Sequence, residues 1–385
     1  MIITIICDVL GEKNNGTTIA CINLIKSLKE RGHNVRVVCP DSDKKGEPGW
    51  YVVPELNLGF INYFVHKNNV KLASPDKKIL ENAIRDCDLV HTTFVFDLSK
   101  TAITIAKRFG KPVTSSFHCQ AENYTTHLGL QNMEFINRLV YKRYYRQIFR
   151  RADCVHFPTQ FVRDIFEKVT APVNGVVISN GVNDIFRNIP VPKPSCLENK
   201  FVILSVGRLS DEKNHSVLIR GIAKSKHRKD IHLIIAGEGP EKGKLYRLAH
   251  RYGVDMEIGF YPREKLVEIM NYSDLYVHPS KVEIEAISCL EAICCGLVPI
   301  VSDSPKAATR NYAITSKNIF ESNNAQSLAE RMDYWIEHPE EKKACSKEYL
   351  KAAIWFNQRK CMDQMEEMMV DTVRNHGHEK DGILH

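Results

Sequence analysis

Two glutamates eight residues apart, Glu283 and Glu291, flank the expected start of a helix in the segment SKVEIEAISCLEAICCGLVPIV. If the helix begins near Ala286 or Ile287, Glu283 precedes it and Glu291 lies a turn further on, with the free amides of the first turn between them. Such amides can bind a diphosphate, and carboxylates on either side can accept hydrogen bonds from sugar and ribose hydroxyls. Taken alone, the pair is better explained by a buried helix that happens to contain a glutamate. Other residues must therefore decide between a binding site and a purely structural helix.

Two further segments place phosphate-binding groups between a predicted strand and a helix. VGRLSDEKN follows a strand and puts Arg208 and Lys213 on a loop at its carboxyl end, where ligands of open α/β sheets bind. A guanidinium can contact two phosphate oxygens, and an ammonium adds a point charge. Asn14-Asn15-Gly16-Thr17-Thr18 follows the first strand, and Gly16 lets backbone amides approach an anion. A threonine-capped strand–helix turn explains this second segment equally well.

These loops connect predicted strands to predicted helices. Short β-branched runs alternate with helical patterns along the whole chain, which indicates parallel sheets covered by helices. Expected strands of the first half are Ile2–Ile6, Asn34–Val38, Leu89–His91, Pro112–Ser116, Cys154–Phe157 and Val176–Ile178. Those of the second half are Phe201–Val206, His232–Ala236, Met256–Ile258, Leu275–Val277, Pro299–Val301 and Asn318–Phe320. Expected helices include Thr17–Glu30 and a long one over Ala344–Arg374. The fold class is α/β with two domains.

The proline-rich segment NIPVPKPSCLENK is the predicted linker. We therefore expect a first domain over residues 1–190, a linker over 191–200, a second domain over 201–350, and a final helix and tail over 351–385 that returns to the first domain.

Composition limits the possible functions. The chain has 385 residues, 43% of them hydrophobic and 26% charged, which is typical of a folded protein with more than one core. The net charge of +7 is too small to indicate nucleic acid but can favour an anionic surface. The 12 cysteines lack metal-ligand spacing and are expected to be reduced thiols of a cytoplasmic protein. Neither a signal peptide nor a transmembrane run is expected.

The motifs VGRLSDEKN, IAGEGP, HPSKVEIEAISCLEAICCGLVPIV and VISNGVNDIF together resemble those of family 4 retaining glycosyltransferases. The resemblance implies the GT-B fold, with two Rossmann-like domains that face each other across a cleft. It implies that the first domain binds the acceptor and the second binds a nucleotide sugar. It also implies transfer with retention of anomeric configuration and no required metal or other cofactor, the UDP-sugar being the donor substrate.

Carried over by residue, the resemblance implies that Arg208 and Lys213 hold the diphosphate, that Glu291 binds the ribose and that Glu283 holds hydroxyls of the donor sugar. Retention without an evident nucleophile indicates front-face return, in which the leaving phosphate helps to deprotonate the acceptor hydroxyl. Arg208 and Lys213 would then be catalytic as well as binding groups, because negative charge grows on the leaving UDP. Glu283 would orient the sugar.

Two residues of the first domain complete the predicted site. Gly16 would bring its amide toward the phosphate. His118, in SSFHCQAEN, matches the histidine that lies near the transferred sugar in this family, although a satisfied histidine at a strand end is the alternative.

The chain departs from the broad family pattern at Ile284-Glu285-Ala286 and at Ser304–Ala308, where glycines are usual. Glu285 could share the sugar-facing role. SKVEIEAISCLEA and FHCQAEN resemble the subgroup that makes α-linked glycolipids from diacylglycerol or ceramide, with UDP-glucose or UDP-galactose as donor. Alternatives are the same chemistry on a polysaccharide or other soluble acceptor, a nucleotide-sugar epimerase, and a non-catalytic nucleotide-sugar-binding protein.

A possible membrane-binding segment is Arg138–Arg151, RLVYKRYYRQIFRR, in which basic residues alternate with aromatic ones as in helices that lie on anionic bilayers. The segment Gly59–Lys78 adds apolar residues followed by lysines. The alternative for Arg138–Arg151 is an apolar core face with a solvated basic back. We expect a peripheral protein at the inner face of the cell membrane that binds no nucleic acid.

Overall fold

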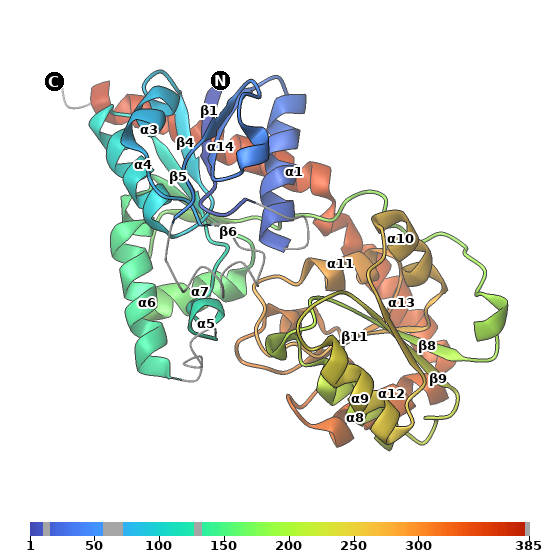
Figure 1. Ribbon diagram of the computed structural model, residues 1–385. Helices are drawn as coiled ribbons and strands as arrows, with labels where there is room; N and C mark the ends of the chain where they lie inside the picture. Colours follow the sequence, from blue (N-terminus) through green and yellow to red (C-terminus); the bar gives the residue numbers. More distant parts are fainter. Residues whose placement is uncertain (11–15, 57–71, 127–132, 382–385) are drawn as a thin grey trace. The chain divides into compact units, whose positions relative to one another are not determined.

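The computed structural model describes residues 1–10, 16–56, 72–126 and 133–381, and it divides the chain into two compact units (Figure 1). The first unit comprises Met1–Asn180 and Cys361–His385, and the second comprises Gly181–Lys360. Each unit contains one parallel sheet with helices packed against it. The predicted fold class, two Rossmann-like α/β domains, is confirmed.

The sheet of the first unit has the strand order β3-β2-β1-β4-β5-β6-β7. Its strands are β1 (Ile2–Ile6), β2 (Asn34–Cys39), β3 (Trp50–Val52), β4 (Leu89–Thr92), β5 (Val113–Ser116), β6 (Cys154–Phe157) and β7 (Gly175–Val177). Its helices are α1 (Gly16–Glu30), α3 (Lys77–Ile84), α4 (Asp97–Arg108), α5 (Ala121–Thr126), α6 (Glu134–Gln147), α7 (Gln160–Val169) and most of α14 (Gln358–Asp381). The sequence did not predict β3, which is only three residues long and lies at the sheet edge.

The sheet of the second unit has the strand order β10-β9-β8-β11-β12-β13. Its strands are β8 (Phe201–Val206), β9 (Ile231–Ala236), β10 (Met256–Gly259), β11 (Leu275–His278), β12 (Pro299–Ser302) and β13 (Ile319–Phe320). Its helices are α8 (His215–Lys224), α9 (Lys242–Tyr252), α10 (Arg263–Tyr272), α11 (Ile287–Cys294), α12 (Ala325–Glu337) and α13 (Pro339–Ala353). Consecutive residues of β8 such as Val202, Ile203 and Leu204 are fully buried, as expected of a strand covered on both faces.

Two glycine-containing loops of the second unit contact each other backbone to backbone. A Cβ atom added at Gly237 would lie 2.0 Å from the carbonyl oxygen of Gly207, and one at Gly239 would lie 2.5 Å from that of Leu209. The Leu209 amide donates to the Glu238 carbonyl at 2.9 Å. Glycine in AGEGP therefore allows the loop after β9 to support the loop after β8, which carries Arg208 and Lys213.

The expected long helix over Ala344–Arg374 is two helices, because the chain is interrupted between α13 and α14. Around Asn357 the backbone forms a parallel bridge with Val182, whose amide donates to the Phe356 carbonyl and whose carbonyl accepts from the Gln358 amide at 3.0 Å. These bonds use backbone groups that a continuous helix would need for itself.

Helix α14 then packs on the first unit beside α1 and β1 (Figure 1). Its buried face includes Met362, Met365 and Met369. Glu366 pairs with two residues that follow α1: its Oε1 lies 2.7 Å from His33 Nε2 and its Oε2 lies 3.0 Å from Arg31 Nε. The return of the C-terminal helix to the first domain therefore occurs as the sequence predicted.

Residues 181–190, which the sequence assigned to the first domain, pack instead within the second unit. Phe186 is buried in its core. Asn188 Nδ2 donates to the Cys295 carbonyl at 2.9 Å, and the Ile189 amide donates to Asn271 Oδ1 at 2.8 Å. The structural division thus precedes the proline-rich linker.

None of the helices in the described residues is long and apolar enough to cross a bilayer.

Candidate functional site

Glu283 lies between β11 and α11 and is held by groups from two other parts of the second unit. Its Oε1 atom accepts from Lys213 Nζ, on the loop after β8, and from His278 Nε2, at the end of β11, at 2.8 Å. Burial alone would raise the pKa of Glu283, but the adjacent Lys213 and His278 outweigh it and hold the pKa below its ordinary value. Glu283 is therefore an ionised, buried carboxylate.

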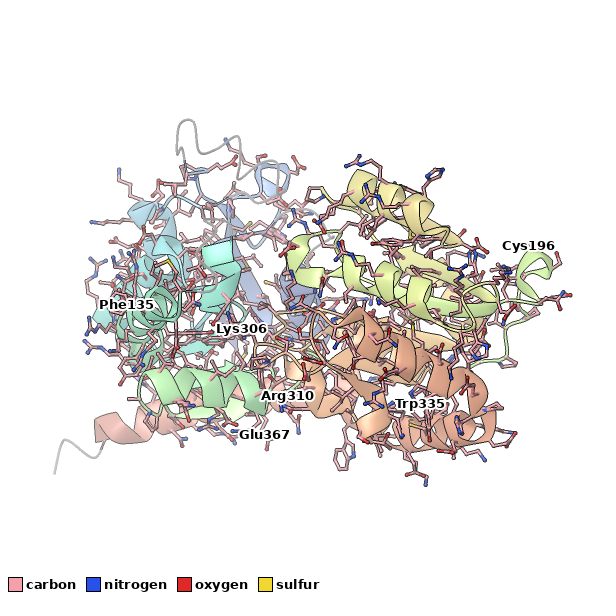
Figure 2. The ribbon with its side chains drawn as sticks, turned by 90° about the horizontal axis from the view of Figure 1, so that it is seen from below. Phe135, Cys196, Lys306, Arg310, Trp335 and Glu367 are labelled. Carbon is pink, nitrogen blue, oxygen red and sulfur yellow. The ribbon has the colours of Figure 1, made fainter. Side chains whose placement is uncertain are left out.

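The backbone at Glu283 is fixed by the segment Ser304–Ala308, which departs from the family pattern. The Glu283 amide donates to the Lys306 carbonyl at 3.1 Å, and its carbonyl accepts from the Ala308 amide at 2.9 Å. Lys306 is marked in Figure 2. This segment therefore helps to set the position of Glu283.

Helix α11 begins at Ile287, as predicted, and Ala286 is its N-cap residue. Ala286 has φ 57° and ψ 64°, a left-handed conformation that costs a non-glycine residue roughly 1–2 kcal/mol. The Cys289 amide donates to the Ala286 carbonyl at 2.8 Å, whereas the first two amides of α11, those of Ile287 and Ser288, have no intrahelical acceptor. An anion can bind there.

Glu291 lies in α11 and pairs with Arg263, the first residue of α10. Arg263 Nη2 donates to Glu291 Oε1 at 3.0 Å, and the guanidinium lies over the Phe186 ring at 5.2 Å from its centroid. Burial raises the pKa of Glu291 to about 7, although Arg263 acts in the opposite direction. Glu291 thus titrates near neutral pH.

Arg208 and Lys213 lie on one loop, as predicted, and this loop is joined to the segment before α11. The Lys281 amide donates to the Glu212 carbonyl at 2.8 Å, and Lys281 Nζ lies 2.9 Å from Asp211 Oδ2. The structure therefore brings Lys213 and Glu283 together and places Arg208 on the same supported loop. Glu285 is also buried, and its carbonyl accepts from the Tyr312 hydroxyl.

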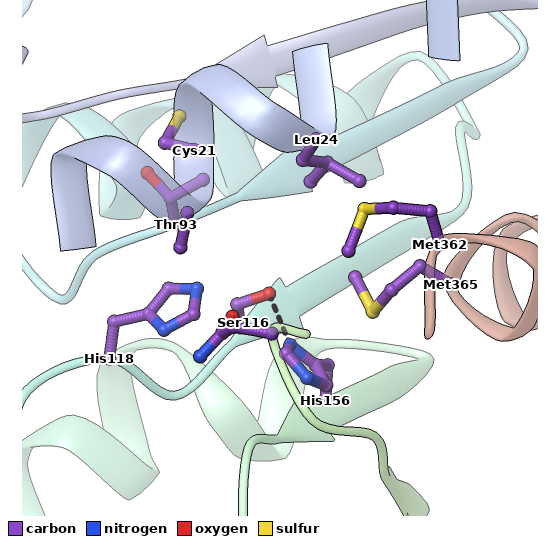
Figure 3. A pocket seen from close by; sticks show the side chains of 10 residues that line it. Cys21, Leu24, Thr93, Ser116, His118, His156, Met362 and Met365 are labelled. Carbon is purple, nitrogen blue, oxygen red and sulfur yellow. Dashed lines mark hydrogen bonds between the residues drawn. The ribbon is translucent and has the colours of Figure 1, made fainter. Parts of the chain in front are cut away.

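In the first unit, His118 follows β5 and lines a small cavity of about 10 Å³, which has room for one water molecule at most. Thr93, Ser116, His156 and Met365 are among its other lining residues (Figure 3). Burial lowers the pKa of His118 well below its ordinary value, and the nearby His156 and His91 lower it further. His118 is therefore a neutral imidazole.

Gly16 is the first residue of α1, as the predicted phosphate loop requires. Asn14 and Asn15 of that loop lie outside the described residues. Among the described residues, no group of three or more His, Cys, Asp or Glu residues could hold a metal ion.

Behind His118, a chain of hydrogen bonds crosses the sheet. His156 Nε2 must donate to the Ile178 carbonyl, 2.7 Å away, so a neutral His156 accepts at Nδ1 from the Ser116 hydroxyl at 2.9 Å. Ser116 Oγ then accepts from His91 Nε2 at 3.0 Å, and His91 Nδ1 accepts from Thr114 at 2.9 Å. Burial lowers the pKa of His91 to about 3 and that of His156 to about 4, consistent with neutral rings.

Comparison with known proteins identifies the fold and the family. Residues 191–351 match the family described as glycosyl transferases group 1, and residues 14–185 match glycosyltransferase family 4. The chain belongs to the family 4 glycosyltransferases of the GT-B fold.

Three similar proteins illustrate the relationship. The alpha-monoglucosyldiacylglycerol synthase of Streptococcus pneumoniae is 24% identical over 79% of this chain and 72% of its own length. The catalytic domain of the cholesterol-alpha-glucosyltransferase of Helicobacter pylori is 45% identical, covering 40% of this chain and 97% of that domain, with a TM-score of 0.39. HepE from Anabaena, solved in complex with UDP, superposes with a TM-score of 0.73 at 15% identity and covers 96% of this chain and 99% of its own.

The basic segment of this glycosyltransferase is only partly as predicted. Tyr141, Tyr144 and Phe149 are buried, and Tyr141 and Phe149 stack against Phe117 in an aromatic core. They therefore cannot contact a bilayer, which corrects the sequence interpretation of these aromatics. The apolar residues that α6 exposes lie nearer its start: Phe135 (Figure 2) is 71% exposed and Leu139 is 51% exposed.

Exposed basic residues share this face of α6 at helical spacing from Phe135; they are Arg138, Lys142, Arg143 and Arg146. The segment Gly59–Lys78 that was also predicted to contact membrane lies largely outside the described residues.

Sequence reasoning about this glycosyltransferase missed His278 and Arg263. His278 stands in the quoted HPSKVE motif five residues before Glu283, so its position at a strand end was an available signal. Arg263 lies 28 residues before Glu291, and no local pattern links the two.

We predict that Ser116→Ala lowers the free energy of unfolding by about 1–3 kcal/mol, because it leaves His91 and His156 with unpaired buried nitrogens. Ser205→Ala is the matched control: Ser205 is also 1% exposed, and its hydroxyl has no hydrogen-bond partner among the described residues. Its removal should be nearly neutral. Urea unfolding of both variants measures the difference, and equal destabilisation would contradict the hydrogen-bond chain.

Proposed function

We propose that this glycosyltransferase transfers glucose or galactose from a UDP-sugar to the hydroxyl of a membrane lipid, diacylglycerol or ceramide, with retention to form an α-glycosyl lipid. The observation that carries the proposal is the buried carboxylate of Glu283, held by Lys213 and His278 beside the start of α11. Two connections of the second unit that contact each other, the loop after β8 and the segment before α11, thus offer a sugar-hydroxyl acceptor, an ammonium and free helix amides.

The donor would lie along this turn. Lys213, Arg208 and the first amides of α11 would neutralise the diphosphate without a metal ion, and Glu291 would accept from the ribose hydroxyls. Glu283 would accept from hydroxyls of the hexose. Gly16 and His118 of the first unit would contribute an amide and a neutral imidazole. The UDP complex of HepE supports the choice of nucleotide, since HepE has the same fold.

The proposed chemistry needs no protein nucleophile. As the bond from the anomeric carbon to the UDP oxygen breaks, negative charge grows on the diphosphate, and Arg208 and Lys213 stabilise it more strongly than in the ground state. The leaving phosphate oxygen takes the proton of the acceptor hydroxyl, which attacks from the same face. Glu283 holds the hexose during this exchange.

A membrane lipid is the proposed acceptor for two reasons. The exposed face of α6 combines Phe135 and Leu139 with basic side chains, a composition that favours an anionic bilayer surface. The relative from Streptococcus pneumoniae is named for the synthesis of a glucosyl diacylglycerol. The proposed location is the inner face of the cell membrane.

Incubation of the protein with labelled UDP-glucose or UDP-galactose and liposomes of diacylglycerol, ceramide or cholesterol should give a labelled glycolipid. NMR should show an α-anomeric linkage. Lys213→Met should lower kcat by about 100-fold or more, because a group that stabilises the leaving diphosphate is lost. Lys224→Met, at an exposed site on α8, is the control and should leave the rate unchanged.

A soluble oligosaccharide product, with no lipid labelled, would overturn the lipid acceptor. A β-linked product would overturn retention. Preference for cholesterol would keep a lipid hydroxyl as acceptor but replace the diacylglycerol or ceramide backbone.

We predict that the affinity for UDP-glucose rises about tenfold between roughly pH 6 and pH 8. Glu291, whose pKa is raised to about 7, is mostly protonated at the lower pH and ionised at the higher one, where it accepts better from the ribose. Calorimetry should show that Glu291→Gln abolishes this rise. Glu268→Gln, which breaks an exposed pair with Lys265, should retain it. A pH-independent wild-type affinity would contradict the ribose assignment.

Reversing two charges on α6, Arg143→Glu with Arg146→Glu, should weaken sedimentation with anionic vesicles by at least about tenfold, since each basic residue near such a surface contributes about 1 kcal/mol. The matched control is Lys343→Glu with Lys347→Glu on α13, an equal charge change at exposed positions of the other unit. Equal loss in both double variants would indicate a net-charge effect and contradict a role for α6.

A further inference from the structure

His278 is a buried histidine with a partner at each ring nitrogen. It ends β11 and is 1% exposed. Its Nδ1 lies 3.1 Å from the Tyr276 hydroxyl, and its Nε2 lies 2.8 Å from Glu283 Oε1 and 3.1 Å from Ser280 Oγ. The ring also stacks on Tyr276, with 6.0 Å between centroids and 24° between planes. The imidazole is therefore fixed in position and in orientation.

The hydrogen bond to Glu283 has a defined direction. An ionised carboxylate only accepts, so Nε2 of His278 carries a proton and donates it to Oε1. On the other side of the ring, the Tyr276 hydroxyl lies 3.2 Å from Ser288 Oγ, which donates to the Val206 carbonyl at 3.2 Å. The hydroxyl of Tyr276 thus ties His278 to the end of β8 and to the first turn of α11.

The two donors to Glu283 use the same oxygen. Lys213 Nζ and His278 Nε2 both contact Oε1. Within the part of the chain that the structure describes, no hydrogen bond reaches Oε2. The contacts therefore divide the carboxylate into an oxygen held by the protein and an oxygen available to another donor.

We propose that His278 is a positioning residue for donor recognition: it fixes Glu283 through Oε1 so that Oε2 accepts a hydrogen bond from a hydroxyl of the donor hexose. This inference rests on the proposed function and deepens it. Lys213 alone cannot hold the carboxylate in this way, because its ammonium on a flexible stem also has to bind the diphosphate. The rigid ring, anchored at Nδ1, can hold Glu283 before and after the donor binds.

The role proposed for His278 predicts different effects on the binding of UDP and of a UDP-hexose. UDP and a UDP-hexose share the diphosphate and the ribose, and they differ in the group that Glu283 contacts. Loss of the His278 contact should therefore weaken UDP-hexose binding and spare UDP binding. A residue that only supports the fold would weaken both.

The test measures the affinities of wild-type protein and variants for UDP and for UDP-glucose and UDP-galactose by calorimetry, without acceptor. In His278→Leu, we expect affinity for the preferred UDP-hexose to fall about tenfold and affinity for UDP to stay within about twofold. His278→Gln should restore most of the loss, because the glutamine amide can donate from nearly the position of Nε2. Tyr276→Phe, which removes the Nδ1 anchor together with the contact to Ser288, should cause a smaller loss with the same ligand dependence.

The control is His227→Leu, the same substitution at a partly exposed histidine whose Nε2 also contacts a glutamate, Glu337, at 3.1 Å. It should leave both affinities unchanged. Equal weakening of UDP and UDP-hexose in His278→Leu and Tyr276→Phe, or no rescue by His278→Gln, would overturn the inference. A wild-type protein that binds neither ligand would overturn the proposed function, and this inference with it.

Discussion

A buried carboxylate must be paired, and this constraint organises the second unit around the start of α11. Glu283 and Glu291 are 9% and 7% exposed, and removing such a charge from water costs several kcal/mol unless donors replace the lost hydration. The donors come from distant parts of the sequence: Lys213 from the loop after β8, His278 from the end of β11, and Arg263 from the start of α10. Pairing two glutamates thus fixes the relative positions of three connections at the carboxyl edge of one sheet.

Such convergence requires backbones to approach more closely than side chains usually allow. The loop after β8 rests on Gly237, where any Cβ would collide with the Gly207 carbonyl. The segment before α11 is paired through Glu283 to Ala308 and ends in Ala286, which retains a left-handed conformation without being glycine. Strain of this kind persists where surrounding contacts determine the conformation, and it commonly marks a functional turn. Here the strained residue immediately precedes the first amides of α11.

The elements of this architecture were predictable because their signals are local. Continuous β-branched runs identified strands such as Phe201–Val206, and the apolar stripe after Ala286 identified α11. The remainder depends on contacts between distant residues. The break near Asn357 is caused by Val182. Tyr141 and Phe149 are buried because Phe117 and its neighbours form an aromatic core, and periodicity alone cannot distinguish such a core from a bilayer-facing surface. Arg263 and His278 were missed for the same reason. Sequence motifs identified the two glutamates, but the residues that pair with them are determined by the fold.

What a buried histidine does in this chain follows from the groups that lie beside its ring. His91, His156 and His118 have hydroxyls, a carbonyl and one another as neighbours, so burial keeps them uncharged. His278 has an ionised carboxylate at Nε2, so it supports a negative charge. A neutral imidazole can bind an uncharged hydroxyl without attracting counter-ions, whereas a cluster of cations and carboxylates suits a charged diphosphate and its sugars. The groups beside each ring, and not burial alone, therefore decide whether a buried histidine stays uncharged or supports a carboxylate.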